Sequence, residues 1–150
     1  MQPVTQTHPV SKKALWTGYI MSAIPVLMLI FSAVMKFAKP PPILEGFQHL
    51  GLPENLAFGL GVLELGCTLL YLIPSTSVLG AILLTGYLGG AILAHLRVGD
   101  QFVGPVIFGV LIWGGLFMRD PRLRALIPLR RNLARAPIEQ RQPNPEPVTK

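Results

Sequence analysis

A run of 17 uncharged and mostly apolar residues, 78–94, constrains this 150-residue chain more than any other feature. As a helix extended to Leu96 it would be about 28 Å long, close to the ~30 Å hydrocarbon core of a bilayer. Gly86, Gly90 and Ala94 recur every four residues and therefore share one smooth helix face. Small residues at this spacing let membrane helices approach closely, so we expect this face to pack against a helix of the same bundle or of a second copy.

The apolar residues fall into four blocks, separated by short polar or proline-containing segments. Only 13% of residues are charged, whereas a soluble domain carries about 25%. A signal peptide is the alternative for the first block, but signal-peptide cores are about 7–15 residues long and this block is longer, with Lys36 near its end. We therefore predict an all-α fold, a four-helix transmembrane bundle over residues 15–118, with spans at 15–37, 56–73, 78–96 and 102–118.

The segments outside this bundle are polar or basic. We expect residues 1–14 to be a disordered cytoplasmic N-terminus and residues 137–150 to be a disordered tail. Residues 119–136 form a basic segment, in which Asp120 and Pro121 are suited to begin a short helix that lies at the membrane interface. A calmodulin-like or nucleic-acid partner for this segment is the weaker alternative, and we expect no nucleic-acid binding.

Lysines and arginines predict the orientation of the bundle. With four spans both termini lie on one side, and the terminal segments carry ten basic residues against three in the two loops of the other side. Because cytoplasmic segments carry the excess of positive charge, both termini are predicted to be cytoplasmic.

Glu64 is the outlier among the apolar spans, since it lies in the middle of the second one. A carboxylate exposed to lipid costs at least a few kcal/mol, so it must be paired, protonated or turned toward protein. Its helical neighbours are mostly small or able to form hydrogen bonds, and we expect it to point into the bundle. An intramembrane carboxylate predicts a functional site, and an interhelical hydrogen bond that only fixes helix register is the equal alternative.

Five further titratable residues fall near the extracytoplasmic ends of the helices in this topology and can gather around one vestibule: Lys36, Glu45, His49, His95 and Arg97. For Lys36 we expect the side chain to extend to the lipid headgroups rather than to reach Glu64. Arg97 is close enough in sequence to pair with Asp100.

Tyr87 lies mid-membrane, where its hydroxyl can bond to Glu64, to a quinone carbonyl or, more commonly, to a backbone carbonyl. Cys67 is the only cysteine, which excludes an intramolecular disulfide, and no neighbouring base supports it as a nucleophile. Histidines and carboxylates occur without the spacing of a metal site, so we expect no metal. The sequence identifies no catalytic residue and leaves open whether the protein is an enzyme.

Several segments read together resemble the DoxX-like family of small bacterial four-helix membrane proteins. They are FSAVMKF at 31–37, GLP at 51–53, GVLELG at 61–66, YLIP at 71–74, LGAILLTGYLGGAILAHLR at 79–97 and RDPRLRALIPLR at 119–130. The resemblance implies a protein of the bacterial inner membrane. It also implies that Lys36, Glu64, His95 and Arg97 match the recurring polar positions of the family.

The family takes its name from subunits of a thiosulfate:quinone oxidoreductase. The resemblance therefore favours a membrane subunit or accessory protein of a redox system, with a membrane redox partner and no evident cofactor except a quinone. The expected pocket for a quinone or lipid headgroup includes Lys36, Glu64, Tyr87, His95 and Arg97, with Glu45, His49 and Cys67 as secondary candidates. The alternative is a non-catalytic carrier of small solutes or a membrane assembly factor.

Overall fold

The computed structural model describes residues 11–126, all of whose regular elements are α-helices. They are α1 (Lys12–Ala38), α2 (Pro41–His49), α3 (Leu56–Leu72), α4 (Ser77–Arg97), α5 (Val103–Arg119) and α6 (Pro121–Leu126). No strand occurs in this range, so the all-α prediction is confirmed there. The disorder predicted for 1–14 is wrong at residues 12–14, which are helical. Residues 1–10, the predicted tail 137–150 and residues 127–136 of the predicted interfacial segment 119–136 lie outside the described residues.

The helix bounds correct the sequence prediction at two places. First, α1 begins at Lys12 instead of residue 15, because the Ser11 hydroxyl accepts a hydrogen bond from the amide of Ala14 and caps the helix. Second, no helix was predicted between the spans 15–37 and 56–73, but Pro41–His49 is helical. Proline ends α1 but is tolerated in the first turn of a helix, so the same residues that stop α1 begin α2.

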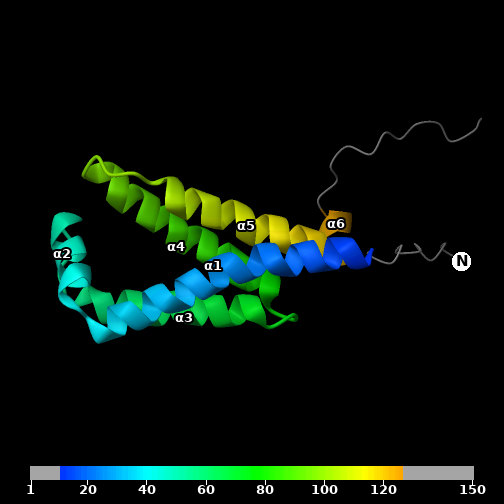
Figure 1. The fold of residues 1–150 in the computed structure, drawn as a ribbon, viewed down its shortest axis with the longest axis horizontal. Helices are drawn as coiled ribbons and strands as arrows, with labels where there is room; N and C mark the ends of the chain where they lie inside the picture. The colour runs from blue at the N-terminus through cyan, green and yellow to red at the C-terminus, as the bar shows by residue number, and fades with distance from the viewer. Residues whose placement is uncertain (1–10, 127–150) are drawn as a thin grey trace, which may run out of the picture.

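The four long helices form a ring in which each packs against two others. α1 packs against α3 and α5, and α4 packs against the same two helices, while α6 packs against the end of α5. Figure 1 shows that the pair α1 and α3 diverges from the pair α4 and α5 toward one end, where α2 lies across the gap. The bundle therefore has a closed end, near the start of α1 and α6, and an open end covered by α2.

Close backbone contacts hold the closed end together. A Cβ atom on Gly80 of α4 would collide with the backbone of Tyr71 in α3, and a Cβ atom on Gly115 of α5 would collide with the backbone of α1 at Gly18 and Ser22. Glycine at these positions lets adjacent helices touch backbone to backbone. These glycines, not the predicted face at Gly86 and Gly90, are the ones that pack helix against helix.

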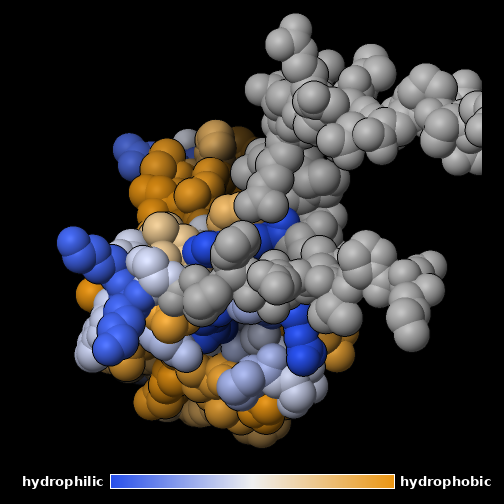
Figure 2. Space-filling view, turned by 90° about the vertical axis from the view of Figure 1, so that its right-hand side faces the viewer, coloured by the Kyte–Doolittle hydropathy of each residue, from blue (hydrophilic) through white to orange (hydrophobic). Residues whose placement is uncertain are grey.

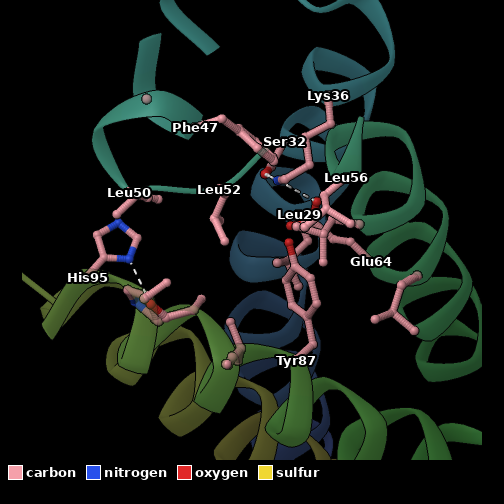
Figure 3. Close-up of a pocket in the computed structure, with 18 of the residues that line it drawn as sticks. Leu29, Ser32, Lys36, Phe47, Leu50, Leu52, Leu56, Glu64, Tyr87 and His95 are labelled. Atoms are coloured by element: carbon pink, nitrogen blue, oxygen red, sulfur yellow. Dashed lines mark hydrogen bonds and ion pairs between the residues drawn. The ribbon is translucent and has the colours of Figure 1, made fainter. Parts of the chain in front are cut away.

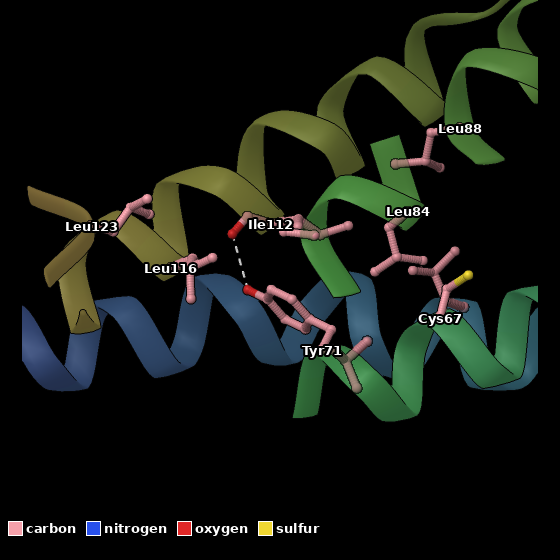
Figure 4. Close-up of a cluster of buried hydrophobic side chains, with 10 residues drawn as sticks. Cys67, Tyr71, Leu84, Leu88, Ile112, Leu116 and Leu123 are labelled. Atoms are coloured by element: carbon pink, nitrogen blue, oxygen red, sulfur yellow. Dashed lines mark hydrogen bonds between the residues drawn. The ribbon is translucent and has the colours of Figure 1, made fainter. Parts of the chain in front are cut away.

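The fully buried Tyr71 joins three helices at the same end. Its hydroxyl donates to the carbonyl of Ile112 in α5 at 2.9 Å. The Ser22 hydroxyl of α1 lies 2.8 Å from the Tyr71 hydroxyl oxygen. Figure 4 shows the ring among Cys67, Leu84 and Leu116. The hydroxyl is the polar group of this side chain, and its two hydrogen bonds compensate for its removal from water.

The outer surface of the bundle is apolar along its length. Trp16 (71% exposed), Leu27 (66%), Leu93 (69%) and Val110 (63%) are among many large hydrophobic side chains that face outward. Figure 2, which views the closed end, shows hydrophilic residues gathered there and hydrophobic residues on the sides. This distribution is typical of helices surrounded by lipid.

Two of the helices, α1 and α4, are long and apolar enough to cross a membrane. α3 and α5 are equally apolar but have 17 residues each, at the lower limit for a span. That all four helices cross the bilayer stays a prediction.

Candidate functional site

A cavity of about 650 Å³ occupies the open end of the bundle, between the two helix pairs and beneath α2 (Figure 3). All four long helices and α2 contribute to its wall, which is mostly aliphatic and aromatic. Pockets that bind small organic ligands are of this size, about 300–1,000 Å³, and combine apolar walls with a few polar groups. The polar side chains of the wall therefore decide what the cavity can bind.

An ion pair lies on the wall formed by α1 and α3. Lys36 Nζ is 2.9 Å from Glu64 Oε2 and also donates to the Ser32 hydroxyl, one turn earlier on α1. Glu64 is 2% exposed and Lys36 is 14% exposed. Pairing makes the site neutral overall, and this is how two charges can be held in an apolar interior.

The position of Lys36 corrects the sequence prediction, which placed its ammonium group at the lipid headgroups. Its side chain instead turns toward α3, because Ser32 and Glu64 provide two oxygens within the reach of Nζ. The inward direction predicted for Glu64 is confirmed by its burial.

Two polar side chains of α4 face the same cavity. Figure 3 shows the Tyr87 ring extending toward Glu64, while His95 lies nearer α2. His95 Nδ1 is 2.8 Å from the carbonyl oxygen of Ala91 and must donate to it, because a carbonyl only accepts. The other ring nitrogen, Nε2, is then left to accept a hydrogen bond from a ligand when the ring is neutral.

The remaining predicted titratable residues lie outside this cavity. The sequence suggested that Arg97 pairs with Asp100. In the structure the Arg97 guanidinium instead donates to the backbone carbonyl of Leu50. Asp100 is instead 3.0 Å from His49 Nε2. These two contacts, from Arg97 to Leu50 and from Asp100 to His49, join the end of α2 to the end of α4 and the turn that follows it.

Glu45 and Cys67 do not contribute to the cavity wall either. Glu45 is exposed on α2, and Cys67 is buried in the hydrophobic core with Leu84. Within residues 11–126, no three His, Cys, Asp or Glu side chains lie together in an arrangement that would hold a metal ion.

The predicted packing face of α4 lines the cavity. Gly86, Gly90 and Ala94 all contribute to its wall, and a Cβ atom on either glycine would meet no other atom within 4 Å. Within the described chain no helix packs on this face, because α3 and α4 have already diverged at this level. A contact with a second copy stays a prediction.

Sequence reasoning missed the contribution of α2. Its only buried side chain is Phe47, which lines the cavity with Ile43 one turn before it. The signal was present, because Ile43, Leu44 and Phe47 follow the prolines at helical spacing and make an amphipathic turn.

A family model described as the DoxX-like family matches residues 20–115, which include most of α1 and all of α2, α3 and α4. No curated protein and no solved structure matches the chain. The match and the apolar outer surface together indicate a membrane protein.

Proposed function

The chain belongs to the DoxX-like family, and from this premise we propose that it binds the headgroup of a quinone in the cavity beneath α2. It would do so as a membrane subunit or accessory protein of a redox system. The observation that carries the proposal is the buried pair Lys36–Glu64 on the wall of an otherwise apolar cavity. The phosphate or hydroxyl group of a lipid offers related chemistry, and the experiment below distinguishes it from a quinone.

The polar groups of the cavity suit both oxidation states of such a headgroup. A quinone carbonyl only accepts hydrogen bonds, and the Lys36 ammonium and the Tyr87 hydroxyl are donors. A quinol hydroxyl also donates, and the Glu64 carboxylate and His95 Nε2 are acceptors. Each of two opposite walls, that of α1 and α3 and that of α4, thus offers one donor and one acceptor. One cavity can therefore hold either form, while its aliphatic side chains surround the ring.

The proposal includes a placement in the membrane. All four long helices would cross the inner membrane of a bacterium, with the closed end at the cytoplasm and α2 at the opposite face. Among the described residues, the closed end carries Lys12, Lys13, Arg119, Arg122 and Arg124. The open end carries three lysines and arginines, Lys36, Lys39 and Arg97, and the excess at the closed end supports this orientation.

Native mass spectrometry of protein purified in mild detergent, with identification of every bound lipid and quinone, tests the proposal. The variants Lys36→Met and Glu64→Gln remove one partner of the pair each. Lys39→Met and Glu54→Gln are matched controls, because they make the same chemical changes at exposed residues that do not line the cavity.

We expect a quinone on the wild-type protein and on both controls, and a loss of most of it from both cavity variants. If a phospholipid is instead bound to the wild type and both controls and is lost from both cavity variants, the ligand of the cavity is a lipid headgroup and not a quinone. Identical bound molecules on all five proteins would refute the headgroup site and favour a solute carrier or an assembly factor.

A further inference from the structure

We infer that the cavity opens sideways into the bilayer between α3 and α4, and that its ligand carries a long apolar tail that passes through this opening. We call the opening the lateral portal; its rim is Leu56 and Leu63 on α3 and Gly86 and Gly90 on α4. The inference rests on the proposed function of the cavity and adds the route of the ligand and its class. A tail that leaves the protein for the lipid would distinguish this site from one for a water-soluble solute.

The exposure of the cavity wall locates the opening. Among wall residues from the four long helices, the exposed ones are the four of the rim, all on α3 and α4. Leu56 is 43% exposed and Leu63 is 51% exposed although both line the cavity. A residue that faces the interior and the exterior at once lies at an edge, so the edge of this cavity runs between these two helices.

The opposite side of the cavity is closed. Its wall residues there come from α1 and α5, and Leu29 is 2% exposed while Phe108 is partly buried against the core. None of the wall residues that α1 and α5 contribute is exposed. A molecule leaving sideways therefore passes between α3 and α4, the pair that separates beyond the contact of Gly80 with Tyr71.

The two glycines of the rim keep the portal wide. A Cβ atom on Gly86 or Gly90 would find open space, whereas one on Gly80 of the same helix would collide with α3. Glycine in a helix interior is unfavourable by roughly 0.5–1 kcal/mol relative to alanine. Close packing within the described chain accounts for Gly80 but not for Gly86 or Gly90, and a passage for a ligand is consistent with the absence of side chains at these two positions.

The portal lies at the level of the polar groups. On α3, Leu60 and Leu63 are the neighbours of Glu64 on the cavity wall, and on α4 Tyr87 directly follows Gly86. A headgroup bonded to Lys36, Glu64 or Tyr87 would thus hold its tail at the portal. Outside the rim the tail meets apolar surface such as Leu93, which is 69% exposed, and then lipid.

The test compares two quinones that share a headgroup and differ in the tail: tail-less dimethoxymethylbenzoquinone and decylubiquinone. Binding of each is measured by titration to the full-length protein in lipid nanodiscs. The variant Gly86→Leu/Gly90→Leu places two side chains in the portal. Gly89→Leu is the matched control, because Gly89 is exposed on the same helix, has open space at its Cβ position and does not line the cavity.

We expect the double variant to bind decylubiquinone at least about tenfold more weakly than wild type, the equivalent of expelling about two methylene groups from an apolar site. Its loss of affinity for the tail-less quinone should be smaller, and this difference between the two ligands is the readout. An unchanged far-ultraviolet circular dichroism spectrum shows that the variant is folded. Gly89→Leu should match wild type for both ligands.

Two other results would be decisive. If wild type binds both quinones and the double variant keeps its affinity for decylubiquinone, the portal is refuted and the headgroup site stands. If wild type binds neither quinone, the proposed function fails and the portal fails with it.

Discussion

The pair Lys36–Glu64 makes a quantitative prediction about stability. Replacing either residue by methionine removes one charge and leaves the other in an apolar wall, where Glu64 is 2% and Lys36 14% exposed. Replacing both by methionine leaves two apolar side chains of similar length in contact. Each single variant should therefore have a lower free energy of unfolding than the wild type, and the double variant should lose less than either single variant.

The magnitude follows from the geometry. At a separation of 2.9 Å and an effective dielectric constant of about 20, the Coulomb attraction is about 6 kcal/mol. Desolvation of the two ions cancels much of it, and an unpaired Glu64 can take up a proton, so we expect each single variant to lose about 3 kcal/mol of unfolding free energy. The double variant leaves no unpaired charge and should lose only about 1 kcal/mol, which gives a coupling energy of about 5 kcal/mol.

The assay is equilibrium unfolding of the four proteins by SDS in mixed micelles, followed by tryptophan fluorescence. Additive losses in the double variant would show that the two side chains do not interact and would refute the pairing. A matched cycle on Lys39 and Glu54, both exposed, should give a coupling energy near zero.

Three further predictions follow from the rest of the fold. Tyr71→Phe should lose about 2 kcal/mol of unfolding free energy in the same titration, because two buried hydrogen bonds disappear; an unchanged midpoint would contradict the role of its hydroxyl. Gly80→Ala should lose about 1–3 kcal/mol through overpacking, whereas Gly66→Ala, in open space, should be neutral or stabilising; equal effects would refute the close contact. In intact cells, a membrane-impermeant maleimide should label Gln101→Cys but not Lys13→Cys when each is made in a protein whose Cys67 has been replaced. The reverse labelling pattern would refute the predicted orientation.

The sequence predicts the helices and the direction of Glu64 because both depend on local patterns. Runs of apolar residues give the four long helices to within a few residues. The small and polar neighbours of Glu64 on its helix face indicate that this face is buried, and the structure agrees. These inferences need only the 3.6-residue period of one helix.

The partner of Glu64 depends on how two helices are rotated about their axes, which no local pattern fixes. Lys36 is 28 residues away in the chain, and its long side chain could equally extend to the interface. The small residues of α4 show the same limit, since a stripe of glycines at four-residue spacing suits a helix contact and a cavity wall alike. Only the divergence of α3 and α4, set by contacts at Gly80, distinguishes the two.

Cross-linking with a photoreactive quinone would show where the headgroup binds in the protein. The purified protein in nanodiscs is irradiated with an azidoquinone and the modified peptides are sequenced. If the quinone binds in the cavity, we expect labels on cavity residues such as Phe47, Tyr87 and Phe108, and we expect excess unlabelled quinone to suppress them. Labels confined to outward-facing residues such as Phe31 and Phe58, with no suppression by competitor, would contradict binding in the cavity.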